Sequence, residues 1–442
     1  MKVKKLLMVT AACLAAAMTW GKEFSLDLRA PTPGTSGRAA RAKLASSLAS
    51  TEDGALRRVD LAAGAAGVGV VSVGDKLSVR LFDDVAVDLV LKQKMPSPLG
   101  GDVFLAEVSG YEGLQTAVVL RTDEGLTVDV QDYRNGKVYK VISTDAGVTV
   151  QEVEAKGGTC GCDTLTPPVP ARKASAKASL SGGVVSDSGG KTCVDILVAY
   201  DQNAATWAIN NGGGITNFAQ MSVQKMNTVL ANNGLDAYFR FRLVGVARVS
   251  DWSDNLEYAL DDVLLGNGEW ASVQTARDEV GADIVTVLID TGSDIGTTGL
   301  GSSLKTMDFE WFADYAYNVC AIRSVAQSHT MTHEVGHNMG CGHSDAQATD
   351  PGPQLYFYSA GYYFTAGGEK YHTVMAYGTE GPGGIEAPFF SSPDSTYKGV
   401  AVGDYYHDNS WTLYNTYAAV SQWRAEKGSE IGGGGDVPLE PL

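Results

Sequence analysis

The pattern of apolar and polar positions changes near residue 190. From about Val59 to Ile142, short runs alternate between apolar and polar residues, and turns such as Asn135-Gly136 separate them. A period of two with frequent turns is typical of an antiparallel β domain. From Cys193 onward, apolar runs of strand length alternate with segments of helical spacing, which indicates an α/β sheet. The sequence thus predicts a β-rich part followed by an α/β part.

The α/β part is predicted in some detail. Strands are expected at residues 194–200, 237–249, 283–289 and 315–322, and helices at 217–230, 255–265, 273–280, 328–339 and 410–427. The glycine-rich stretch 292–301 receives no assignment, and residues 344–370 are expected to be irregular because they are rich in Gly, Pro and Tyr.

Composition sets the boundaries of five parts. They are a signal peptide at 1–21, a β-rich domain at 22–163, a flexible linker at 164–190, the α/β domain at 191–427 and a disordered tail at 428–442. The first part has a lysine-rich start and a short apolar run, which includes Cys13, and predicts a secreted or periplasmic protein. Within the second part, residues 22–56 are expected to be poorly ordered, with at most a short helix at 38–47. Arg172, Lys173 and Lys177 make the linker a natural place for activating cleavage.

Charge and hydropathy exclude two classes of partner. The formal net charge is −17, whereas nucleic-acid binding needs a basic surface. Beyond the signal peptide, no apolar run is long enough to span a membrane, so no stable membrane insertion is expected. We expect a monomer.

Residues 333–343, His-Glu-Val-Gly-His-Asn-Met-Gly-Cys-Gly-His, hold three of the six histidines in the chain. His333 and His337 are four residues apart, so both rings project from one face of a helix. Gly340 permits a positive φ that ends the helix, and the chain then returns His343 as a third ligand. Three nitrogens plus an open position are typical of catalytic zinc, and Glu334 is placed to reach a water on the metal.

A structural zinc site is the alternative interpretation of this motif. It requires a fourth protein ligand, for which Cys341 is the candidate inside the motif. Cys341 points away from the ligand face if Gly340 ends the helix, so the catalytic interpretation is preferred.

The motif resembles that of the metzincin zinc metalloproteases, because the histidines, Glu334 and Gly340 fill every fixed position. Thr373-Val374-Met375-Ala376-Tyr377 is similar to their methionine turn. The likeness extends over residues 191–427 and is closest to bacterial reprolysin-like secreted peptidases, although Ser344 resembles matrixins and Tyr377 resembles astacins and serralysins. It implies an α/β (α+β) catalytic domain with a mixed, mostly parallel twisted sheet and a zinc helix, preceded by a β-rich pro-domain.

The resemblance also implies roles for single residues. His333, His337 and His343 would bind one Zn²⁺, Glu334 would act as general base, and Met375 would form an apolar floor below the ligands. Tyr377 would stabilise the oxyanion, the alternative being a packed aromatic side chain. His329 and His372 are interpreted as bystanders, with His372 a candidate for the wall of a substrate pocket, and His407 is expected on the surface. Calcium sites are possible and are not readable from the sequence.

Five cysteines remain after the signal peptide. The resemblance suggests that Cys160 or Cys162 blocks the open zinc position, as a pro-segment cysteine does in matrixins and reprolysins. A Cys160–Cys162 pair or a disulfide to Cys193 are open alternatives. Cys320 and Cys341 flank the zinc helix and are predicted to form a disulfide across it.

These features predict a secreted zinc endopeptidase, made as a zymogen, that acts on proteins or peptides. The alternative is a secreted binding or adhesion protein on a metzincin scaffold, which would not need Glu334. A narrower alternative is a protease that cuts at acidic residues, for which Lys370 is a candidate recognition residue.

Overall fold

The computed structural model describes residues 21–29, 55–155 apart from 96, 98–99 and 112, 159–160, 190–292 and 296–425. The predicted helix at 38–47, the linker from 164 to 189, Cys162 and the predicted tail lie outside these residues, as does the signal peptide up to residue 20. Within the described part of the chain, no helix is both long and apolar enough to cross a membrane.

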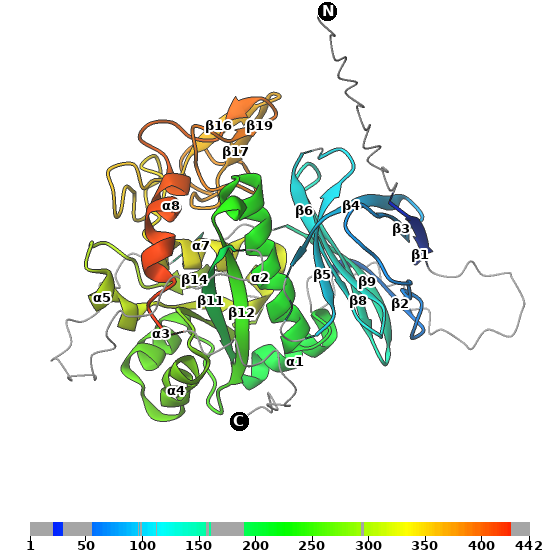
Figure 1. Cartoon of the computed structure of the whole chain (residues 1–442), viewed down its shortest axis with the longest axis horizontal. Helices are drawn as coiled ribbons and strands as arrows, with labels where there is room; N and C mark the ends of the chain where they lie inside the picture. The colour runs from blue at the N-terminus through cyan, green and yellow to red at the C-terminus, as the bar shows by residue number, and fades with distance from the viewer. Residues whose placement is uncertain are drawn as a thin grey trace, which may run out of the picture.

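The first part of the chain is a curled nine-stranded sheet, at the right of Figure 1. An antiparallel meander forms most of it: β3 (Lys76–Phe82), β4 (Val85–Met95), β5 (Asp102–Val108), β6 (Gln115–Arg121), β7 (Leu126–Asp132), β8 (Lys137–Thr144) and β9 (Gly147–Glu154). The alternating apolar residues of these strands point into one buried cluster, as the period of two predicted.

Two strands correct the expectation of poor order before residue 56. β1 (Glu23–Asp27) pairs in parallel with β3, and β2 (Ala55–Leu61) pairs antiparallel with β9. β1 has only five residues, and it is ordered because the edge of β3 offers it a complete set of backbone partners.

The second part is built on a six-stranded sheet with the order β10-β14-β15-β13-β11-β12. Its strands are β10 (Thr159–Cys160), β11 (Thr192–Tyr200), β12 (Phe239–Arg248), β13 (Ile284–Ile289), β14 (Thr297–Gly301) and β15 (Tyr317–Ala321). All neighbours run parallel except β14 and β15, so the sheet is mixed and mostly parallel, as expected.

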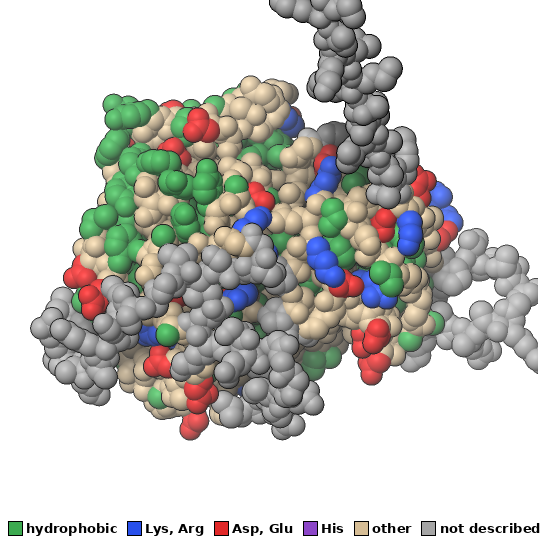
Figure 2. All heavy atoms as spheres, viewed as in Figure 1, with side chains coloured by type: hydrophobic (Ala, Val, Ile, Leu, Met, Phe, Trp, Pro, Cys, Tyr) green, Lys and Arg blue, Asp and Glu red, His purple; other side chains and the backbone are tan. Residues whose placement is uncertain are grey.

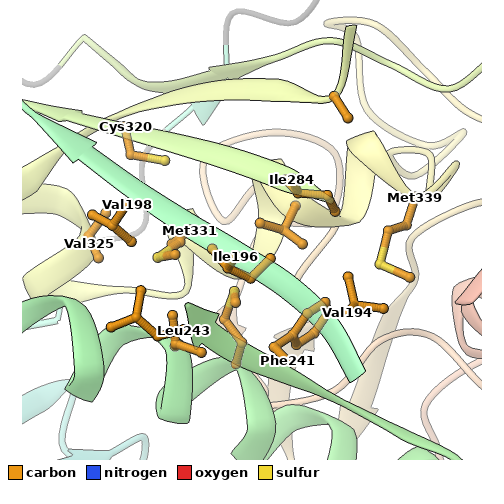
Figure 3. Packing of buried hydrophobic residues seen from close by; sticks show 14 of the residues in the cluster. Val194, Ile196, Val198, Phe241, Leu243, Ile284, Cys320, Val325, Met331 and Met339 are labelled. Carbon is orange, nitrogen blue, oxygen red and sulfur yellow. The ribbon is translucent and has the colours of Figure 1, made fainter. Parts of the chain in front are cut away.

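Helices cover both faces of this sheet. α1 (Gln202–Asn211), α2 (Ile215–Asn232), α6 (Ile322–Gln327), α7 (Thr330–Asn338) and α8 (Asn409–Val420) share one core, and α3 (Leu256–Leu265) and α4 (Ala271–Val280) share the other. Figure 3 shows Val194, Ile196 and Val198 of β11 pointing into the first core, with Met331 and Met339 nearby. α1 was not predicted. Short helical turns occur at α5 (Phe309–Phe312), η1 (Leu235–Ala237), η2 (Gly268–Trp270) and η3 (Ala313–Tyr315).

The segment after the zinc motif has more regular structure than predicted. β16 (Tyr363–Ala366) and β17 (Glu369–His372) form a hairpin to which β18 (Ile385–Glu386) adds in parallel, and β19 (Thr396–Tyr397) pairs with β20 (Val400–Ala401). Gly367 and Gly368, both with positive φ, supply the turn of the hairpin.

The two parts meet along α2. Met221 of this helix packs into an apolar cluster with Val118 and Leu120 of β6. At the end of the helix, the Asn232 Oδ1 atom accepts from the Gln115 N–H at 2.8 Å, and its Nδ2 donates to the Gln115 carbonyl at 3.1 Å. The Asn232 side chain therefore pairs with β6 as a neighbouring strand would.

The predicted Cys320–Cys341 disulfide is wrong. Both thiols are free and buried. Cys320 faces the core beside Val198 and Val325 (Figure 3), whereas the Cys341 thiol donates to the carbonyl of Asn409 at the start of α8 at 3.7 Å. Each side chain packs against a different neighbour, and burial raises the pKa of both thiols.

Candidate metal centre

Three imidazole rings converge beside α7. His333 and His337 lie one turn apart on this helix, and His343 follows a turn at Gly340, where φ is +94°. Their Nε2 atoms lie 2.9–3.1 Å from one another, and all three rings are buried. The structure thus brings the predicted triad together.

The second nitrogen of each ring fixes the tautomer. Each Nδ1 lies 2.8–3.0 Å from a backbone carbonyl oxygen, those of Val374, Cys341 and Asp350 respectively. A carbonyl oxygen only accepts, so each Nδ1 carries the proton and each Nε2 presents a lone pair. Three facing lone pairs repel one another unless a cation lies between them. Nitrogens at about 2.0–2.1 Å from one tetrahedral Zn²⁺ lie about 3.3 Å apart, so the donor set fits zinc.

Burial also keeps these rings neutral. Desolvation lowers the pKa of His333 to about 4, and it lowers the pKa of His337 and His343 well below the ordinary value. A metal binds neutral imidazole, so at neutral pH no proton has to be removed before binding.

The Glu334 side chain lies between α7 and β14. A Cβ atom at Gly299 would lie 2.3 Å from its Oε1 atom, and one at Gly301 would lie 3.1 Å from its Oε2 atom. The two glycines therefore leave the space that this carboxylate occupies. Burial raises the pKa of Glu334 well above its ordinary value, which suits a group that accepts a proton during a reaction.

Met375 and Tyr377 approach the triad from the other side. A Cβ atom at Gly336 would lie 2.7 Å from the Met375 sulfur, so the methionine packs directly below α7. The Tyr377 hydroxyl lies 3.2 Å from the His343 Nε2 atom, and its ring packs against His343 with centroids 4.7 Å apart. Tyr377 therefore faces the metal position.

Comparisons with known proteins agree with this geometry. Residues 190–387 match the family model Reprolysin_5, described as metallopeptidase family M12. A peptidyl-Asp metalloendopeptidase of Pseudomonas aeruginosa (strain PAO1) is 29% identical over 276 residues, which cover 56% of this chain and 43% of the relative. Residues 190–387 therefore resemble a metzincin-like zinc metalloprotease domain of family M12, and we call them the metalloprotease domain. The chain spans less than half the length of the curated relative.

Solved structures give weaker likenesses. Metalloproteinase-II from Bacteroides fragilis shares 11% identity with a TM-score of 0.39, covering 63% of this chain and 84% of that one. A chaperone–substrate complex shares 16% identity with a TM-score of 0.39, covering 80% of this chain and 44% of that one. Both scores are low, and neither likeness supports an argument about fold.

A small pocket opens beside the triad of the metalloprotease domain. Its lining includes His329, His333, Glu334, His372 and Glu386. His372 therefore lines a pocket wall, as its position suggested. The His329 Nε2 atom turns away from the metal and lies 2.7 Å from the Tyr133 hydroxyl of the first sheet. Burial raises the pKa of Glu386 to about 7.

Two other expectations are corrected by their surroundings. Lys370 is exposed, does not line this pocket and donates weakly to the Pro382 carbonyl at 3.5 Å. His407 is not a simple surface residue, because its Nδ1 lies 2.7 Å from an oxygen of Asp404 and its Nε2 lies 3.0 Å from one of Asp345.

Cys160 reaches the metalloprotease domain through its backbone. β10 pairs with β14, and Cys160 stands opposite Gly299, the residue that borders Glu334. The strand before the linker thus lies along the edge of the site. The Cys193 thiol lies 3.8 Å from the Lys191 carbonyl at the start of β11.

Several residues that hold the site were not predicted. Asn338 donates to the carbonyls of Ser302 and Tyr317 and ties α7 to the sheet. Asn409 accepts from the Gly342 N–H at 3.1 Å and donates to its carbonyl at 2.9 Å. Asn338 could have been found from the sequence, because it is a polar residue of the motif on a helix face that is buried. The sequence around Asn409 does not indicate its role.

Proposed function

We propose that this protein is a zinc-dependent endopeptidase that is secreted or periplasmic and made as a zymogen. The observation that carries the proposal is the convergence of three neutral Nε2 atoms beside a buried glutamate and a tyrosine hydroxyl. This arrangement places three metal donors, a base and a hydrogen-bond donor around one open position.

The residues have distinct tasks. His333, His337 and His343 would hold Zn²⁺, which when bound supplies Lewis acidity toward a water molecule and a peptide carbonyl. Glu334 accepts the proton of the attacking water and transfers it to the leaving amine. The Tyr377 hydroxyl donates to the oxygen that gains charge. Met375 and the three backbone carbonyls keep the rings in place.

The first sheet is proposed to be a pro-domain. Two observations support this: β10 occupies the edge of β14 next to Glu334, and the sheet docks on α2. Cys160 or Cys162 would block the open metal position. Cleavage within residues 164–190 would free this end of the first part, so that the cysteine leaves the site while the sheet stays docked on α2. The alternatives of a Cys160–Cys162 pair or a bond to Cys193 remain open.

The relative named peptidyl-Asp metalloendopeptidase suggests a narrower proposal, cleavage beside aspartate. The pocket next to the triad is small and polar, and His329, His372 and Glu386 line it. A peptide library with every residue at the positions flanking the cut tests this proposal, and a preference for large apolar residues would contradict it.

Glu334→Ala tests the endopeptidase proposal. We expect one zinc per chain by elemental analysis in both wild type and variant, and casein cleavage in the processed wild type alone. Glu310→Ala, an exposed glutamate of α5, serves as the control and should leave cleavage unchanged. Cleavage by the Glu334 variant, or its absence in a zinc-loaded wild type cut between residues 164 and 190, would contradict the proposal.

A further inference from the structure

Exposed aromatic side chains gather on the face of the molecule that carries α8. The exposed fraction is 56% for Phe357, 69% for Tyr405, 62% for Tyr406 and 48% for Trp411. Figure 2 shows hydrophobic side chains concentrated on this side of the molecule. We call these four residues and Tyr414 the aromatic face.

Ring contacts join these residues into two groups. Phe357 lies 5.5 Å from Tyr405 and 6.3 Å from Tyr406 between ring centroids. Trp411 stacks on Tyr414 at 4.8 Å with an interplanar angle of 11°. Asn415 lies between the groups, since its Nδ2 donates to the hydroxyl of Tyr358, the neighbour of Phe357. An exposed cluster of this kind indicates a binding surface.

The backbone below the aromatic face is held in place. The Asp408 N–H donates to the Tyr358 carbonyl at 2.8 Å, and the Asp408 carboxylate accepts from the Trp411 N–H at 2.8 Å. Ser359 and Thr412 share a hydrogen bond between their hydroxyls at 2.7 Å. A surface built this way loses little conformational entropy when a partner binds.

The charges around the aromatic face have one sign. The side chains of Asp345 and Asp404 are 54% and 46% exposed, and His407 lies between them. Even a protonated His407 offsets only one of the two carboxylates. No Lys or Arg occurs in residues 324–369 or 399–423, the two segments that contain the five residues of this face. The surface therefore attracts cations and repels phosphate groups, which excludes nucleic acid and anionic lipid as occupants.

We propose that the aromatic face binds a lysine- or arginine-rich segment of a partner protein. Tyr and Trp rings attract ammonium and guanidinium groups through their faces, and the two exposed carboxylates add charge complementarity. An extended segment rises about 3.3 Å per residue, so a segment of several residues can contact both groups of rings. A single small cation would use only one group.

A labelled peptide measures this binding directly. The probe is a fluorescein-labelled decapeptide of alternating Lys and Ala, and the matched probe carries acetyl-lysine in place of each Lys. Full-length Glu334→Ala protein is used so that neither peptide is cut, and fluorescence anisotropy reports binding. We expect the Lys peptide alone to bind, with affinity that falls at least about tenfold in 0.5 M salt.

Matched substitutions locate the site. Trp411→Ala and Tyr405→Ala should each weaken binding about threefold or more, and the double variant about tenfold. Trp252→Ala, which removes an aromatic side chain 60% exposed outside the face, should leave it unchanged, with circular dichroism confirming that all variants fold.

Four outcomes would overturn the proposal. They are no binding by the parent protein, equal binding of the acetylated peptide, equal weakening by Trp252→Ala, and displacement of the peptide by cellohexaose, which would assign the face to a neutral glycan. The chain's own basic segment could also compete for the face. If the triple variant Arg172→Gln, Lys173→Gln, Lys177→Gln binds the peptide more tightly than the parent protein, the face belongs to that segment instead.

Discussion

At the scale of single residues, the carbonyl partners of three Nδ1 atoms determine what the site can bind. Because Val374, Cys341 and Asp350 accept those protons, a ring cannot switch tautomer without turning the Nδ1 lone pair toward a buried carbonyl oxygen that has lost its donor. The centre is therefore organised before any metal arrives, and its preference is for one cation with an affinity for imidazole.

Tyr377→Phe tests the role of the hydroxyl that faces the metal position. Zinc content should not change, because the phenol is not one of the three nitrogen donors. kcat should fall by about 10² while KM changes little, since the lost hydrogen bond forms with the charge that develops in the transition state. Steady-state kinetics on a fluorogenic peptide measures both.

The matched control is Tyr258→Phe, on a tyrosine that is 67% exposed on α3. An unchanged kcat for Tyr377→Phe would show that Tyr377 is only a packed aromatic side chain.

Much of the metal centre could be predicted from the sequence because its ligands are local. His333 and His337 are one helical turn apart, so spacing alone placed them together. The supports of the site could not be predicted, because Asn409 and Asp350 act through contacts that depend on the whole fold. The Cys320–Cys341 prediction failed for a related reason: proximity of two cysteines along the chain does not decide which way the thiols point.

At the scale of elements, β14 shows how glycine can hide a strand from prediction. Two of the five residues in Thr-Thr-Gly-Leu-Gly are glycines, which are depleted in strands, so the local pattern predicts no strand here. Glycine is needed at these positions because the Glu334 side chain occupies the space that a larger residue would require. The prediction of β11, β13 and α7 succeeded because their apolar patterns are long and regular.

Gly299→Ala tests this account of β14. The added methyl group would lie 2.3 Å from Glu334 Oε1, so the carboxylate must shift. We expect zinc binding to persist and the rate of peptide hydrolysis to fall at least about tenfold, since small misplacements of a catalytic group have effects of this size.

Gly296→Ala provides the comparison, because nothing lies within 4 Å of its added Cβ atom. Equal rates for the two variants would show that the space beside Glu334 is not needed.

At the scale of the whole molecule, buried histidines link stability to pH. Burial lowers the pKa of His372 and of His333 to about 4 from an ordinary 6.5, so the unfolded chain binds their protons first. Stability of the zinc-free protein should therefore fall as the pH drops from 6.5 to 4, by up to about 3 kcal/mol for each ring. Glu386 has the opposite effect. Its pKa is raised to about 7, so the stability that it contributes in its protonated form is lost as the pH rises from 4.5 to 7.

Urea denaturation of EDTA-treated protein across this range measures the effect. In His372→Asn, stability should fall less steeply below pH 6.5, and the three histidine ligands remain in place. A variant whose midpoint follows pH as steeply as wild type would show that His372 is not a source of the acid sensitivity.

The contact between the two parts predicts their behaviour after the linker is cut. Met221 is buried against the first sheet, so the two fragments should remain together in gel filtration after limited trypsin digestion. Met221→Asp places an unpaired carboxylate in that contact, which costs several kcal/mol, and the fragments should then elute separately.

Leu265→Asp, on a residue that is 61% exposed, is the control and should leave the fragments associated. Separation of the wild-type fragments would show that the linker alone holds the parts together.

The two hydrogen bonds between Asn409 and Gly342 join residues that are 67 positions apart. During synthesis, the loop that carries His343 leaves the ribosome long before α8 exists to hold it. The third ligand therefore reaches its final position late, after nearly all of the described chain has been made. Loading with metal then becomes a step of maturation, and the ion that enters is chosen by the compartment in which the finished chain folds.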